Sequence, residues 1–200
     1  MQKLNLFSLE EKLAELHKQI FTPQDLILLF EVKKRAVEGF LSYNVAKNKI
    51  IHLRKGFYSL KKNYLSPYLI ANKIYQPSYI SFETALSYYG LIPETVYTMT
   101  SATPKSTREF EARGIVYSYQ TIKKDAFTGY VLQTIEDNKI YIATPEKAMA
   151  DYCYFMLLGK KNWNDRFDLK KINFSKLKEY LKLFKKERLV QVVRRYISNI

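Results

Sequence analysis

The sequence predicts an α+β protein in which a small helical part precedes a part built on a sheet. Three observations lead to this prediction. Apolar residues recur at helical spacing as far as about residue 46. Four later runs, between residues 96 and 143, are rich in β-branched and aromatic residues and are bounded by turn residues. Amphipathic helical patterns return after that, so we expect a division near residue 62, a mostly antiparallel sheet within 96–143 and helices within 144–200.

The amino-terminal 46 residues predict three helices. The first covers 9–20, with Ser8 as its N-cap. The second begins in Thr22–Asp25, where a threonine cap, a proline at the first helical position and an aspartate form a capping box. The third follows a break near Glu31, and its apolar stripe consists of Val37, Phe40, Leu41 and Val45.

A short hairpin is predicted next. The strand-like runs IIHL (50–53) and FYSL (57–60) are separated by Arg54, Lys55 and Gly56, and the glycine can supply the positive φ of a tight turn. Helix, helix, turn, helix and hairpin is the element order of a winged helix-turn-helix. We therefore predict a winged helix-turn-helix over residues 1–62, with the hairpin as its wing and its two cations directed toward a phosphate backbone.

Residues 63–200 predict a second, mixed α/β part. A short helix is expected in SPYLIANKIY, and another begins at Ser81 and ends at Gly90. The strand-like runs are 96–100, 115–119, 130–134 and 139–143. A helix then starts at Thr144-Pro145, and two more follow Ser175, with the apolar rows Leu177, Leu181 and Phe184, then Leu189, Val193 and Ile197.

The charge of the chain favours an anionic partner. The formal net charge is +14 and the pI is near 9.6, which suits phosphates, anionic membranes or an acidic protein. The first 62 residues carry 12 Lys and Arg against 6 Asp and Glu, and the last 42 carry 13 against 4. No apolar run approaches the roughly 18 residues of a membrane span, no signal segment is visible, and the one cysteine, Cys153, is expected to be a buried, inert thiol. We expect a cytoplasmic protein that binds nucleic acid.

Two groups of side chains are candidates for contact with double-stranded DNA. Cations at a helix N-terminus oppose the macrodipole, so another role is expected for those that open the third helix. Tyr43 could reach a base or sugar, or could equally pack beneath the wing. The predicted DNA-binding residues are Lys33, Lys34, Arg35, Ser42, Tyr43, Arg54 and Lys55. A candidate second basic surface, which could bind phosphates or could contact a toxin or the RNA substrate of a toxin, contains Lys182, Lys185, Lys186, Arg194 and Arg195.

The chain resembles the AbiEi family of antitoxins from type IV toxin–antitoxin (abortive infection) systems. The resemblance covers residues 22–60, which end in LRKGFYSL, and residues 79–158, which contain SFETALSYYGLIPE, the turn TSATPK and the helix start IATPEKAMAD. It implies that residues 1–62 bind the promoter of their own operon and repress it. It also implies that residues 63–200 form an antitoxin domain, which counteracts a nucleotidyltransferase-like toxin without needing a stable complex.

Enzymatic activity is not expected, and we assign no catalytic residue, cofactor or metal. Glu83 and Glu146 fall in first helical turns, where carboxylates stabilise the helix dipole, and Lys147 and Asp151 can pair at i,i+4 spacing. The alternative is a metal-dependent nucleic-acid-processing enzyme, with a site among Asp25, Glu31 and Asp151. A third interpretation is a membrane-surface or adaptor protein that uses the tail helices.

Overall fold

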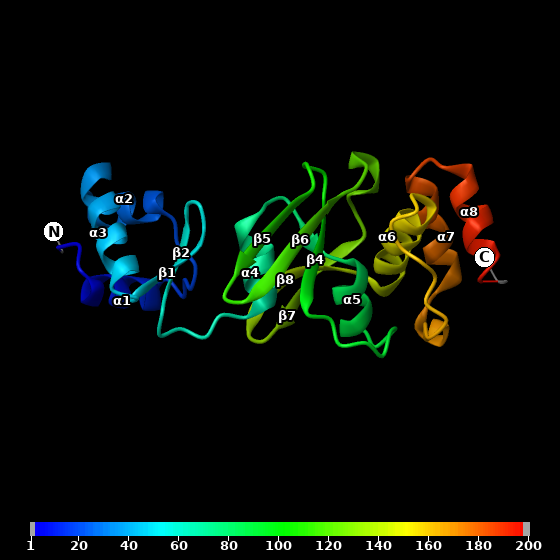
Figure 1. The fold of residues 1–200 in the computed structure, drawn as a ribbon, viewed down its shortest axis with the longest axis horizontal. Helices are drawn as coiled ribbons and strands as arrows, with labels where there is room; N and C mark the ends of the chain where they lie inside the picture. The colour runs from blue at the N-terminus through cyan, green and yellow to red at the C-terminus, as the bar shows by residue number, and fades with distance from the viewer. Residues whose placement is uncertain (1–2, 198–200) are drawn as a thin grey trace. The chain divides into compact units, whose positions relative to one another are not determined.

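The computed structural model describes residues 3–197, which divide into two compact units (Figure 1). Unit 1 contains the chain up to Ser66 together with Glu111–Gly114, and unit 2 contains Pro67–Phe110 and the chain from Ile115 onward. Helices dominate unit 1, and unit 2 combines helices with a six-stranded mixed sheet. The α+β class predicted from the sequence is confirmed.

Unit 1 consists of three helices followed by a hairpin. The hairpin is antiparallel, with Ile50 opposite Leu60, and it contains an irregularity between His52 and Arg54. The elements are α1 (Leu6–Glu15), α2 (Pro23–Phe30), α3 (Lys34–Ala46), β1 (Ile50–Arg54) and β2 (Phe57–Leu60).

Helix α1 begins and ends earlier than predicted. Asn5, not Ser8, is its N-cap, because the Asn5 side chain accepts a hydrogen bond from the backbone N–H of Ser8 at 3.0 Å. Ser8 lies inside the first turn and is buried. The helix ends before Leu16, which is 53% exposed, so the predicted continuation to residue 20 is also wrong.

Helix α2 has the capping box that the sequence predicts. The N–H of Asp25 donates to Thr22 Oγ1 at 3.2 Å, and the N–H of Thr22 donates to Asp25 Oδ2 at 2.7 Å. Lys18 Nζ lies 2.7 Å from Asp25 Oδ1. Burial alone would raise the pKa of Asp25, but the hydrogen bonds from Lys18 and Thr22 outweigh it, so its pKa lies below the ordinary value of 3.8.

We expect Asp25→Ala to weaken α2 by about 1 kcal/mol at pH 7, the usual cost of losing such a cap. Because the folded pKa of Asp25 is lowered, this stabilisation is present above pH 3.8 and is lost as the pH falls through the folded pKa. Native-state hydrogen exchange of the α2 amides measures the difference between wild type and variant. A difference that does not shrink below pH 3.8 would contradict the assigned role of the carboxylate.

The core of unit 1 draws on every one of its elements. Phe21, between α1 and α2, forms an isolated antiparallel bridge to Tyr58 of β2, with N–H···O distances of 2.9 and 2.8 Å. The short extended segment before α2 is thereby tied to the hairpin. The buried core residues are Leu9, Leu13, Phe21, Leu26, Phe30, Val37, Leu41, Ile50 and Leu60.

Unit 2 is built on a six-stranded sheet with helices packed against it, and only the last two residues of its strand β5, Glu111 and Ala112, are grouped with unit 1 (Figure 1). The strands follow the order β5-β6-β4-β3-β8-β7. They are β3 (Tyr79–Ile80), β4 (Thr98–Thr103), β5 (Arg108–Ala112), β6 (Ile115–Thr121), β7 (Tyr130–Ile135) and β8 (Asn138–Ala143), and the helices are α4 (Pro67–Ile74), α5 (Phe82–Tyr88), α6 (Pro145–Leu157), α7 (Phe174–Leu183) and α8 (Glu187–Arg194).

The sheet is mixed, which corrects the prediction of a mostly antiparallel sheet. β4 pairs with β6 in parallel and β3 pairs with β8 in parallel, while β3–β4 and β7–β8 are antiparallel. The prediction missed β3, which contributes only two residues, and β5, whose sequence REFEA is largely exposed and lacks the pattern of a buried strand. The sheet therefore begins before residue 96.

The carboxy-terminal helices gather beside the sheet, with α6, α7 and α8 in mutual contact (Figure 1). Thr144 caps α6 by accepting from the Lys147 N–H at 3.3 Å, as the Thr-Pro sequence predicts. Both predicted apolar rows of α7 and α8 are buried, and Tyr154 of α6 stacks on Phe184 with ring centroids 4.3 Å apart.

Cys153 is buried as expected, and burial raises the pKa of its thiol to about 12. Within residues 3–197, none of the helices combines the length and the apolar character needed to cross a bilayer.

Candidate nucleic-acid interface

A hollow of about 630 Å³ lies on the surface of unit 1. It brings together side chains from α3 and from the hairpin, including three of the predicted DNA-binding residues: Lys34, Ser42 and Lys55. Its full lining is Pro23, Lys34, Glu38, Leu41, Ser42, Val45, Ala46, His52, Lys55, Gly56 and Tyr58.

Helix α3 presents one polar face because its other face is committed to the core. Val37 and Leu41 are buried, and Asn44 is buried with its Nδ2 donating to the Phe40 carbonyl at 2.7 Å. Arg35 and Ser42 are exposed, and Tyr43 is 63% exposed. Tyr43 therefore does not pack beneath the hairpin, which excludes one of its two predicted placements.

The cations that open α3 are free of strong partners. Lys33 is the N-cap residue, but its side chain makes no capping hydrogen bond. Lys34 lies 3.7 Å from Glu38 in an exposed i,i+4 pair, whose stabilisation is at most about 0.5 kcal/mol. Both ammonium groups remain available for an anionic ligand.

The hairpin turn places its two cations in different surroundings. Gly56 has φ +83°, as predicted for a tight turn, and Lys55 is exposed beside it. Arg54 is only partly exposed, and its guanidinium carbon lies 6.0 Å from the centre of the Phe57 ring. Of the two, Lys55 is the freer side chain, whereas Arg54 is partly engaged within the hairpin.

Gly39 lies on the exposed face of α3, and the interior of the protein does not require it. A Cβ built at this position would meet no atom within 4 Å, so Gly39 does not serve close packing against α2. Glycine in a helix interior costs about 1 kcal/mol relative to alanine. At this position the backbone of α3 is therefore accessible to a molecule that approaches from the solvent.

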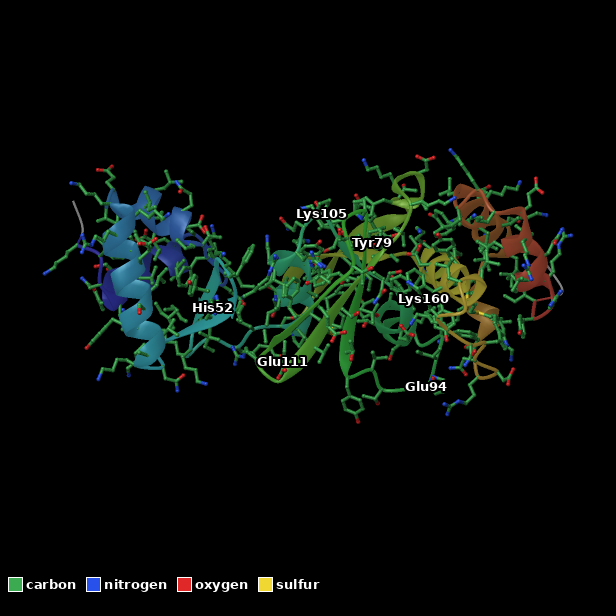
Figure 2. The ribbon with its side chains drawn as sticks, turned by 45° about the horizontal axis from the view of Figure 1, so that its top comes forward. His52, Tyr79, Glu94, Lys105, Glu111 and Lys160 are labelled. Atoms are coloured by element: carbon green, nitrogen blue, oxygen red, sulfur yellow. The ribbon has the colours of Figure 1, made fainter. Side chains whose placement is uncertain are left out.

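Two residues of this surface were not predicted. His52 is exposed on β1, lines the hollow and lies with its ring 5.0 Å from that of Tyr58 (Figure 2). Lys47 follows α3, with its ammonium 6.0 Å from the Tyr43 ring. Strand alternation did not indicate His52, because residues i and i+2 share a face and alternation would place His52 on the side of buried Ile50. The irregularity between His52 and Arg54 breaks this pattern, and no local sequence signal marks it.

The predicted second basic surface belongs to unit 2. Lys182 projects from α7, and Lys186 and Arg195 border α8; all three are exposed. Arg194 is also exposed at the end of α8. Lys185 is engaged, because it lies 2.5 Å from Asp125, and this hydrogen bond raises the pKa of Lys185.

The three carboxylates considered for a metal site, those of Asp25, Glu31 and Asp151, have different surroundings. Asp25 is held by Thr22 and Lys18, and Glu31 is an exposed residue in the left-handed region that ends α2. Asp151 is fully buried in unit 2. Over the part of the chain that the structure describes, no group of three His, Cys, Asp or Glu side chains could hold a metal ion.

A buried polar centre in unit 2 accounts for Asp151. Its carboxylate accepts from Lys147 Nζ, from Tyr79 OH at 3.0 Å and from Ser81 Oγ at 2.7 Å (Figure 2 labels Tyr79). The predicted i,i+4 pair of Lys147 and Asp151 is confirmed, but it is fully buried. Burial raises the pKa of Asp151 and lowers that of Lys147, while their mutual attraction opposes both shifts. The Ser81 hydroxyl serves this centre and makes no hydrogen bond as the cap of α5.

Comparison of the chain with protein-family models finds no match, and comparison with curated proteins finds none.

Proposed function

We propose that this protein is a DNA-binding transcriptional autorepressor and the antitoxin of a type IV toxin–antitoxin system. In this proposal unit 1 is a winged helix-turn-helix, α3 is its recognition helix and the β1–β2 hairpin is its wing. The observation that carries the proposal is the hollow in which Lys34 and Ser42 of α3 meet Lys55 of the hairpin. Positive side chains on a helix and on an adjacent hairpin are the arrangement by which winged helices hold the phosphates on both sides of a groove.

Three further features of unit 1 support the assignment. The Phe21–Tyr58 bridge adds a short extended segment between α1 and α2, so the order becomes helix, strand, helix, helix, hairpin. The turn between α2 and α3 is short, with Glu31 in the left-handed region. Gly39 leaves the outer face of α3 without a side chain at its middle, where a duplex would approach closely.

The antitoxin part of the proposal rests on the resemblance over residues 79–158, and it assigns the effect to unit 2. Co-expression with a candidate nucleotidyltransferase-like toxin, scored as rescue of growth, tests this part. Full-length protein is expected to rescue growth. No rescue by protein that is stably produced would contradict the antitoxin assignment while leaving the DNA-binding assignment intact.

Titration of the protein onto a duplex from its own promoter at several salt concentrations tests the DNA-binding part. We expect the logarithm of the affinity to fall linearly with the logarithm of the salt concentration, by about 0.9 for each phosphate neutralised. A scrambled duplex of equal length serves as the control and should bind more weakly. Equal affinity for the two duplexes would remove the proposed autorepressor role.

The alternative function, that of a metal-dependent nucleic-acid-processing enzyme, predicts cleavage of DNA or RNA. Incubation of the protein with labelled DNA or RNA and Mg²⁺ or Mn²⁺ separates a nuclease from a repressor. We expect intact nucleic acid, because Asp25 and Asp151, two of the three carboxylates considered for a metal site, are held by other side chains or backbone groups of the protein. EDTA-sensitive cleavage would favour the enzyme.

A further inference from the structure

A second pocket, of about 460 Å³, lies within unit 2, and its lining shares no residue with either predicted basic surface. One wall is the segment that leads into β4, and the other is the loop that follows α6. Figure 2 shows Glu94 on the first of these segments. The lining combines the carboxylates of Glu83 and Glu94 with Tyr97, Tyr152 and Phe167, and it contains none of the predicted DNA-binding residues.

This pocket already holds one cation of the chain itself. The ammonium of Lys161 is paired with Glu83 Oε1, and it lies 5.6 Å from the centre of the Phe82 ring and 5.3 Å from that of Tyr152. A carboxylate combined with aromatic ring faces is the environment in which proteins recognise organic cations. Both carboxylates of this pocket thus attract a cation of the chain, Lys161 at Glu83 and Arg166 at Glu94.

Each carboxylate retains one unused oxygen. Glu94 Oε1 accepts from Asn164 Nδ2 at 2.8 Å and from Arg166 Nη2. The Oε2 atoms of Glu83 and Glu94 are both buried, and within residues 3–197 neither has a hydrogen-bond partner. A buried acceptor without a donor costs about 1–3 kcal/mol. A ligand that donates a hydrogen bond to either oxygen recovers that cost.

We propose that this pocket binds a guanidinium group on an apolar stem, as in an arginine side chain. A guanidinium carries five N–H donors in a planar arrangement. One guanidinium can therefore donate hydrogen bonds to carboxylate oxygens while its plane stacks on an aromatic ring. Ile92, Val96 and Phe167 supply apolar surface for the stem. The ligand can be a free guanidinium compound or an arginine of a peptide, and the experiment separates these two sources.

The proposal is tested on the full-length protein by NMR titration with three probes. These are agmatine, a blocked Gly-Arg-Gly peptide, and the same peptide with neutral citrulline in place of arginine. We expect the arginine peptide to bind at least tenfold more tightly than the citrulline peptide. The chemical-shift changes should occur at backbone amides around the pocket. Binding of agmatine as tight as that of the peptide identifies a free guanidinium compound as sufficient, and tighter peptide binding identifies a peptide as the source.

Substitutions of Glu94 and of its partner Arg166 are expected to have opposite effects on the binding affinity. Glu94→Gln keeps the shape and removes the charge, and it should weaken binding at least tenfold. Arg166→Gln frees Glu94 Oε1 from an in-chain cation whose side chain is 67% exposed, and it should strengthen binding several-fold. Glu109→Gln removes the same charge from exposed β5 and should change nothing. Equal affinity for arginine and citrulline, or unchanged binding by Glu94→Gln with a wild-type melting curve, would overturn the proposal.

Discussion

Replacing Asp151 by alanine is expected to lower the free energy of unfolding of unit 2 by about 3–5 kcal/mol, the usual cost of removing one partner of a buried ion pair. The variant leaves the Lys147 ammonium fully buried with no carboxylate, 4.8 Å from the centre of the Phe184 ring. The hydroxyls of Tyr79 and Ser81 lose their acceptor at the same time. Urea unfolding followed by the fluorescence of Trp163, which lies in unit 2, measures the loss.

Two controls separate this effect from a general loss of charge. The double variant Lys147→Met/Asp151→Leu removes both buried charges, so it should recover most of the lost stability. Glu38→Ala breaks the exposed pair with Lys34 and should change the stability of unit 1 by at most about 0.5 kcal/mol. An Asp151→Ala protein as stable as wild type would show that the buried pair contributes little to the fold.

The triple variant Lys33→Ala/Lys34→Ala/Lys55→Ala is expected to lower the affinity for promoter DNA by about 10- to 100-fold, because each exposed ion pair contributes at most roughly 1 kcal/mol. The slope of log affinity against log salt should also decrease by about 3, since each lost contact leaves one phosphate with its counterions. Fluorescence anisotropy with a labelled duplex measures both quantities. All three side chains are exposed, so folding should be unaffected.

A charge-matched variant decides whether position or net charge matters. Lys73→Ala/Lys124→Ala/Lys139→Ala removes three exposed cations from unit 2, outside both predicted basic surfaces. Its affinity should fall much less than that of the first triple variant. Equal losses in the two proteins would mean that binding follows net charge, and the surface of α3 and the hairpin would lose its assigned role.

Local sequence patterns predicted the elements whose formation depends on neighbouring residues. The Thr22–Asp25 capping box, the Gly56 turn, the Thr144-Pro145 helix start and the apolar rows of α7 and α8 are all found. In each case the deciding interaction is a cap, a turn or a helical face, formed by residues a few positions apart. The prediction of a Ser8 cap was wrong because the helix begins three residues earlier, where the Asn5 side chain accepts a hydrogen bond from the backbone N–H of Ser8 itself.

The candidate sites also combine features that the local sequence predicted with features that depend on the tertiary structure. The distribution of charge and the order of the elements indicated which basic residues could bind DNA. They did not indicate that Arg54 lies beside Phe57 or that Lys185 pairs with Asp125. The pocket around Glu83 and Glu94 had no signal in the sequence. Lys161 lies 78 positions from Glu83, and no periodicity connects residues so far apart.

By itself the sequence determined the α+β class, most of the helices and strands, and the faces of the helices that are buried, because each depends on local hydrogen bonds and on the repeat of apolar residues. Only the tertiary structure decided the parallel pairing of β3 with β8 and of β4 with β6, and the burial of Lys147 with Asp151. Strand pairing and the desolvation of a charge both depend on what lies opposite in space, and that information is spread over residues distant in the chain.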